Sequence, residues 1–206
     1  AKLKEIQINL DLAETMGKLQ GQLHTRAIKK VHVECAGTMD EAKPAALAFL
    51  KGLLNDRIPD RVNYINAETL AIELGIGIEH SYTSDCSSYT NLIRTKGTGE
   101  SDSTEIHGSV FERNQIRLVN ILGYEFDVTP YGTMLFTRNN DVPGVIGKVG
   151  TMLGKANVNI GAYLLSREMN DGEAFSVIRV DNPVAENILN DLQDLPEIIS
   201  VQQLHC

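Results

Sequence analysis

The sequence predicts an α+β protein with two domains, an α/β domain over residues 1–130 and a smaller domain over residues 131–206. Three observations predict this organisation. Apolar residues recur with helical and strand periods in alternation along the chain. Pro130-Tyr131-Gly132 marks a joint, after which the rhythm changes. Beyond the joint the elements follow the order βαββαβ, which is the plan of a ferredoxin-like domain.

Composition and charge disfavour several classes of protein. The net charge of -8 disfavours nucleic acid, because phosphates need a basic footprint. No apolar run reaches the roughly 18 residues of a membrane span, and no signal-peptide pattern is present. The three cysteines are widely spaced and form no CxxC motif, which indicates free thiols in a reducing compartment. We therefore expect a cytoplasmic protein without a nucleic-acid or membrane partner. Because the chain begins at Ala1 rather than Met, we expect a processed protein or a piece of a longer one.

The first domain opens with helices and a half-buried strand. The expected elements are helices over residues 10–23, 41–56 and 66–75 and a strand over residues 29–37. The second helix begins near Glu41, because Pro44 is tolerated only in a first turn. Asn66 is the expected N-cap of the third helix, and Gly75 ends it.

Short strand patterns fill the rest of the first domain. They cover residues 77–83, 89–97, 105–111, 116–123 and 124–130. Gly-rich turns such as "KGTGESDS" separate them, which is typical of an antiparallel sheet.

The second domain has the cleaner periodicity. Strands are expected over residues 132–139, 159–168, 173–181 and 197–204, with helices over residues 143–156 and 183–194. "MNDG" is a turn signal between the two middle strands, and Pro183 is expected in the first turn of the last helix. This order places two helices on one face of a four-stranded antiparallel sheet.

A polar loop precedes the first helix of the second domain. Asn139, Asn140 and Asp141 are followed by Pro143 and Gly144 at the predicted helix start. Exposed N–H groups of a first helical turn favour an anion, and Asp141 can accept from an ammonium. The loop therefore suits a small amino acid. The alternative is an ordinary helix start, with Asp141 as N-cap and Pro143 in the first turn.

Part of the second domain resembles an ACT domain, the ferredoxin-like module that binds amino-acid effectors. The stretch that carries the resemblance is "NNDVPGVIGKVGTMLGKANVNIGAYLLSRE", and its sequence is similar to the ACT domain of D-3-phosphoglycerate dehydrogenases. Upstream, "VNYINAETLAIELGI" and "RLVNILGYEFDVTPYGTMLF" resemble the intervening domain of the same family, often called its allosteric substrate-binding domain. The two resemblances together run from about Leu10 to Leu204. They imply a regulatory, serine-sensing and oligomerising part of an enzyme of L-serine biosynthesis.

The resemblance also implies an effector site. In this family L-serine lies between two ACT domains, and the residues that hold it map onto Asn139, Asp141 and Asn159, the last from the facing subunit. The Pro143-Gly144 turn shapes the pocket. Asn139 departs from the His or Tyr that is frequent there, so L-serine or another small amino acid is expected. The implied partners are a second copy of the chain and the catalytic domains of the same enzyme.

A second ligand is implied for the first domain, where the family is thought to bind a small phosphorylated or acidic molecule. Arg117 falls where the family often has a basic residue, whereas Thr129 stands where some members have another Arg. Arg94, Lys96 and Arg113 are further candidates, and all four basic residues are equally consistent with solvated surface charges.

Signals for catalysis, cofactors and metals are missing from the sequence. Gly75-Ile76-Gly77 lacks the third glycine of a dinucleotide fingerprint, and it follows a helix. His32, His80 and His107 lie on predicted strands without ligand spacing. We therefore expect no catalytic site, cofactor or metal in this chain, although the parent enzyme would be an NAD-dependent oxidoreductase. Two alternatives remain, a beta-type subunit of L-serine dehydratase and a free-standing ACT regulator that binds amino acids.

Overall fold

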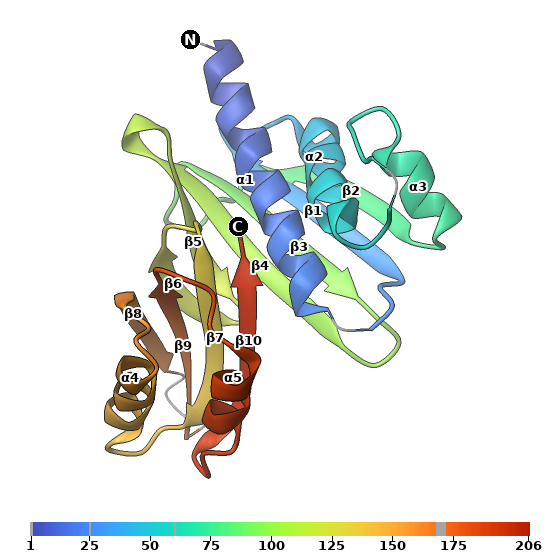
Figure 1. Ribbon diagram of the computed structural model, residues 1–206. Coiled ribbons are helices and arrows are strands. Elements are labelled where there is room, and N and C mark those ends of the chain that lie inside the picture. Colours follow the sequence, from blue (N-terminus) through green and yellow to red (C-terminus); the bar gives the residue numbers. More distant parts are fainter. Residues whose placement is uncertain (1, 25, 60, 168–171) are drawn as a thin grey trace. The chain divides into compact units, whose positions relative to one another are not determined.

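The chain divides into two compact units, which are described separately (Figure 1). The computed structural model describes residues 2–24, 26–59, 61–167 and 172–206, without the side chains of residues 2–5 and 113. The first unit is Ala1–Gly123 and the second is Tyr124–Cys206. The sequence placed the joint one strand later, at Pro130. The domain limits at residues 130 and 131 stay a prediction.

Over its described residues, the first unit consists of three helices, a short 3-10 turn and the strands of a sheet. Its elements are α1 (Lys2–Leu23), β1 (Lys30–Gly37), α2 (Ala42–Asn55), α3 (Ala67–Glu73), β2 (Gly77–Thr83), β3 (Asn91–Thr98), β4 (Ser103–Phe111), a 3-10 turn (Glu112–Asn114) and β5 (Gln115–Ile121). These strands follow the order β2-β1-β3-β4-β5 in the first sheet.

The "MNDG" turn of the second unit lies largely outside the described residues, at 169–172.

One strand of this sheet runs against the sequence-based expectation. β2 pairs parallel with β1, whereas the pairs β1–β3, β3–β4 and β4–β5 are antiparallel as expected. The reason is the connection, because α2 and α3 carry the chain back along the sheet before β2 begins. A crossover of this kind makes a parallel pair, which local strand periodicity does not reveal.

Close packing of α1 on α2 holds the core of the first unit. Leu12, Met16 and Leu19 of α1 recur in the sequence with helical spacing, and all three are fully buried. Two glycines let the helix backbones approach. A Cβ added to Gly17 would lie 2.0 Å from the carbonyl oxygen of Phe49, and one added to Gly52 would lie 2.0 Å from the carbonyl oxygen of Glu14. The contact therefore depends on the absence of a side chain at both positions.

The second unit has the predicted βαββαβ order. After β6 (Tyr124–Val128), its elements are β7 (Thr133–Asn140), α4 (Val145–Lys155), β8 (Ile160–Arg167), β9 (Glu173–Val180), α5 (Glu186–Gln193) and β10 (Ile198–His205). The sheet order is β10-β7-β9-β8 with antiparallel pairs throughout. Figure 1 shows α4 and α5 on the same side of this sheet. The predicted fold class is confirmed.

The helix-facing side of this sheet carries the core of the second unit. Leu135 of β7 and Ile178 of β9 pack there with Val149 and Leu153 of α4 and with Leu192 of α5. On the opposite face of the sheet, the rings of Tyr124, Phe126 and Phe136 gather around Phe175.

Two details of the second unit differ from the sequence pattern. The sequence spacing puts Ile146 on one helical face with Val149 and Leu153, and burial would be expected there, but its side chain is 50% exposed. The last helix begins at Glu186, so Pro183 precedes it instead of lying in its first turn. The side chain of Gln203 accepts from the N–H of Val184 and donates to its carbonyl. Ala185 is extended, so the helix begins only at Glu186. In the part of the chain that the structure describes, no helix has the length and apolarity that crossing a membrane requires.

The close approach of α1 and α2 predicts that alanine is destabilising at Gly17 but not at a glycine with open space around it. Gly17→Ala forces a Cβ against backbone and should destabilise the first unit by about 1–3 kcal/mol, the usual cost of overpacking. Gly150→Ala in α4 is the matched control, because an added Cβ meets nothing within 4 Å there and alanine favours a helix. Urea unfolding with hydrogen exchange of α1 and α4 measures both. Equal stability of Gly17→Ala and wild type would contradict the close approach.

Candidate functional site

A cavity of about 470 Å³ lies at the start of α4. It is lined by residues 141–146 together with Asn139, Leu165 and Arg167. The cavity therefore brings the loop after β7 together with the end of β8. Four of the five residues predicted for the effector site line it, namely Asn139, Asp141, Pro143 and Gly144.

The backbone of Gly144 sets where α4 begins. Gly144 is the N-cap residue, has a φ of 94°, and accepts from the N–H of Lys148 at 3.0 Å. No side chain caps the helix, so the alternative in which Asp141 is the N-cap is wrong. N–H groups of a first helical turn have no acceptor inside the helix. With Gly144, Val145 and Ile146 lining the cavity, its wall is the uncapped start of a helix, where negative charge is favoured.

The polar residues of the loop are fixed by neighbouring backbone. Asn139 is 2% exposed, and its Nδ2 donates to the carbonyl of Asn140 at 2.8 Å. The N–H of Asp141 donates to the carbonyl of Gly172 at 2.8 Å. These bonds leave the carboxylate of Asp141 on the cavity wall, with a side chain that is 30% exposed.

Arg167 is the cavity residue that the sequence reasoning missed. Its Nε lies 3.3 Å from Oδ2 of Asp141. The alternation of residues 160–167 puts Arg167 on the same face as Tyr163, which packs against the helix-side core. This pattern gives the face but not the neighbouring strand, so it does not show that the loop with Asp141 lies beside Arg167. The site therefore holds an ion pair beside the start of a helix.

Asn159, the fifth predicted effector residue, lies elsewhere in the same chain. It precedes β8, whereas Arg167 on the cavity wall ends that strand, about 26 Å away at 3.3 Å per residue. Its Nδ2 donates to Oδ2 of Asp181 at 2.7 Å, and its carbonyl accepts from the N–H of Asp181. A single copy of the chain does not bring Asn159 to the cavity.

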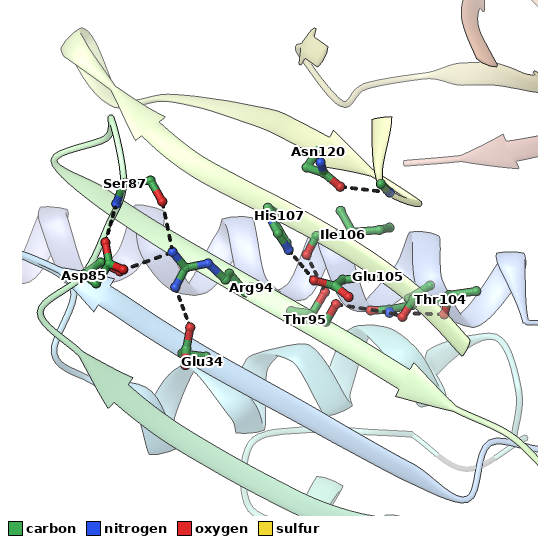
Figure 2. Close-up of polar contacts among 12 residues, drawn as sticks. Glu34, Asp85, Ser87, Arg94, Thr95, Thr104, Glu105, Ile106, His107 and Asn120 are labelled. Atoms are coloured by element: carbon green, nitrogen blue, oxygen red, sulfur yellow. Dashed lines mark hydrogen bonds and ion pairs between the residues drawn. The ribbon is translucent and has the colours of Figure 1, made fainter. Parts of the chain in front are cut away.

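Two of the basic residues predicted to bind an anion, Arg94 and Arg117, contact acidic or polar neighbours. Figure 2 shows that Arg94 is engaged by its own neighbours. It forms an ion pair with Glu34 and donates to the carbonyl of Asp85 at 3.2 Å. Arg117, on β5, donates to Oε1 of Gln115 at 2.8 Å.

Lys96 is exposed and lies two residues from Arg94, on the same face of β3. On the neighbouring strand β4, this face carries Glu105, which is paired in register with Lys96. Oε1 of Glu105 lies 2.6 Å from Nε2 of His107. The side chain of Arg113 is outside the described residues. The surface is therefore mixed in charge, and the anion site stays a prediction.

Three features of the described residues bear on catalysis, metal binding and cofactor binding. Burial raises the pKa of the Cys35 thiol to about 12, with the charges of Glu34 and Asp40 adding to the effect, so this thiol is not a nucleophile near neutral pH. No group of three or more His, Cys, Asp or Glu side chains that could hold a metal ion occurs in this part of the chain. Gly75-Ile76-Gly77 leads from α3 into β2. That order is the reverse of a strand-to-helix phosphate loop, and it does not fit a dinucleotide.

Comparison with known proteins decides the family. The family model of the D-3-phosphoglycerate dehydrogenase intervening domain matches residues 5–122, and that of the ACT domain matches residues 133–197. The chain belongs to the D-3-phosphoglycerate dehydrogenase intervening-domain family. The predicted resemblance is confirmed, with an intervening domain followed by an ACT domain. These are regulatory domains, not the NAD-binding catalytic part.

Three D-3-phosphoglycerate dehydrogenases illustrate the similarity. The protein of Synechocystis is 32% identical over 92% of this chain and 35% of its own length. The protein of Bacillus subtilis is 30% identical over 93% of this chain and 37% of its own length, and that of Archaeoglobus fulgidus is 31% identical over 92% and 37%. The chain thus spans little more than a third of the length of these relatives.

The left-handed backbone at Gly144 gives a first test of the ACT cavity. Gly144→Ala has room for its Cβ, since nothing lies within 4 Å, but the conformation disfavours any L side chain. We expect a loss of about 1–2 kcal/mol in stability. Gly147→Ala, which also has open space, should not show this loss. Thermal unfolding of both variants measures the difference, and equal melting temperatures would contradict the assigned backbone.

Proposed function

We propose that this chain is the regulatory part of a D-3-phosphoglycerate dehydrogenase and that its ACT domain binds a small α-amino acid, with L-serine as the first candidate. The observation that supports this proposal is the cavity in which the Asp141 carboxylate faces the uncapped start of α4. One group attracts a cation and the other an anion. A free α-amino acid carries both charges on neighbouring atoms.

In this proposal each part of the loop has a distinct role. The Asp141 carboxylate binds the ammonium of the ligand in a charge-assisted hydrogen bond. The first N–H groups of α4 bind its carboxylate. Asn139, buried at the cavity wall, offers amide atoms to the polar side chain of the ligand. Pro143 and Gly144 hold the turn that aims the helix start at the ligand.

The proposed assembly is a homodimer of ACT domains. β8 and β10 are the outer strands of the sheet, and a strand at a sheet edge offers backbone groups for pairing with another chain. Asn159 lies too far along β8 to reach the cavity of its own copy. A second copy, placed by the sheet pairing, would bring its Asn159 to this cavity and complete the site.

Regulation would follow from linkage. A ligand that binds one arrangement of the ACT dimer better than another shifts the population toward it, by no more than its difference in affinity. The shift would act on the catalytic domains of the same cytoplasmic enzyme, which would supply the NAD chemistry. On this proposal the purified chain itself does not oxidise phosphoglycerate.

Titration calorimetry tests the ligand. Asp141→Asn removes the charge from one hydrogen bond, of a kind worth about 1.5–3 kcal/mol, and should weaken L-serine binding about ten- to a hundredfold. Asp191→Asn, at a second cavity near the end of α4, is the control and should bind as wild type does. The assignment fails when wild type binds no L-serine, and also when Asp141→Asn binds it equally well.

Mixing two defective variants tests the shared site. Asp141→Asn and Asn159→Ala should each bind L-serine weakly when pure. In a mixed dimer, one site carries both defects and the other carries neither, so mixing after dissociation should restore a fraction of tight sites. Calorimetry of the mixture, with light scattering to confirm dimers, measures this. A mixture no better than its components would contradict a site that bridges two copies.

A further inference from the structure

Arg167 lies in one row with the predicted effector residues. Ala174 of β9 pairs with Asn139 of β7 on one side and with Arg167 of β8 on the other. All three face the helices, since Leu135 and Tyr163, four residues before Asn139 and Arg167, pack against the helix-side core. The guanidinium therefore reaches the cavity from the edge strand, opposite the loop that carries Asp141.

The contact between Arg167 and Asp141 involves only one nitrogen of the guanidinium and one oxygen of the carboxylate. It joins Nε to Oδ2 at 3.3 Å, with the arginine side chain 63% exposed and the aspartate side chain 30% exposed. A guanidinium has five N–H donors in a planar fork, and a carboxylate has two oxygens with several acceptor sites. An exposed ion pair of this kind contributes little to stability. Structural support alone does not account for a charged pair on a cavity wall.

The charges of this pair are complementary to those of an amino acid. The nitrogen and the carboxylate carbon of an α-amino acid are about 2.5 Å apart, because a single Cα joins them. An ammonium on Asp141 therefore places the ligand carboxylate within reach of the neighbouring guanidinium. Arginine binds carboxylates through two parallel N–H groups, which fixes direction as well as charge.

We propose that Arg167 binds the α-carboxylate of the ligand and that Asp141 and Arg167 together select free α-amino acids. This inference rests on the proposed function, in which the cavity binds an amino acid, and it assigns a new residue to one end of that ligand. The N–H groups at the start of α4 then donate to remaining acceptor sites of the same carboxylate. An amine without a carboxylate satisfies Asp141 alone and binds weakly.

Arg167→Gln tests the assignment with two probes, L-serine and ethanolamine. Ethanolamine keeps the ammonium and the hydroxyl but lacks the carboxylate. In calorimetry, wild type should prefer L-serine over ethanolamine by more than about tenfold. Arg167→Gln should bind L-serine about ten- to a hundredfold more weakly, as the loss of a charge-assisted contact predicts, and bind ethanolamine as wild type does.

The matched control is Arg138→Gln. Arg138 is the neighbour of Asn139 on β7, so it faces the opposite side of the sheet, where it pairs with Glu173. This variant removes the same charge near the same end of the sheet and should keep wild-type binding of both probes. Arg167→Lys keeps the charge without the planar fork and should fall between wild type and Arg167→Gln for L-serine.

Three results would overturn the assignment. Unchanged L-serine binding by Arg167→Gln means that the guanidinium does not touch the ligand. Tighter binding means that Arg167 competes with the ammonium for Asp141. Equal losses with L-serine and ethanolamine mean a structural role. In all three cases wild type still binds L-serine, so the proposed function survives; absence of L-serine binding by wild type defeats the proposed function itself.

Discussion

The pairing of β7, β9 and β8 is the constraint on which the candidate site depends. Side chains alternate between the faces of a sheet, so the register decides which residues face the helices. With Ala174 of β9 between Asn139 and Arg167, two polar residues from the strands on either side of β9 share one face at one end of the sheet. A slip of one residue in β8 would turn Arg167 away from the cavity. The site is therefore a property of the sheet as much as of the loop.

The loop after β7 is tied to the β8–β9 hairpin by two contacts at one residue. The N–H of Asp141 donates to Gly172, which precedes β9, and its carboxylate contacts Arg167, which ends β8. The first contact is backbone and does not depend on charge. The second uses the group that would bind a ligand ammonium. A ligand at Asp141 therefore acts on the connection between α4 and the edge strand β8, which is also the strand available for pairing with a second copy.

Sequence patterns predicted the second unit well because its elements are amphipathic and contiguous. The helical spacing of apolar residues and the Pro143-Gly144 turn predicted α4, and four of the residues predicted for the effector site line a cavity. Arg167 was missed because its relevance depends on register across β9, which no local pattern carries. The parallel pairing of β2 was missed for the same reason, since two helices intervene between it and β1. The distance of Asn159 from the cavity likewise follows from strand length and direction.

The two units differ in how their charged residues are arranged around the predicted ligand sites. Arg94 is held by the carboxylate of Glu34 and by the carbonyl of Asp85 (Figure 2). An anion that binds Arg94 would therefore have to displace the Glu34 carboxylate, which is itself negatively charged. In the ACT domain the pair of Asp141 and Arg167 meets a helix start that still favours an anion. A zwitterion can add to that arrangement without leaving either charge unpaired. A basic residue at the expected sequence position therefore indicates an anion site only when its own counter-ion can be shared or released.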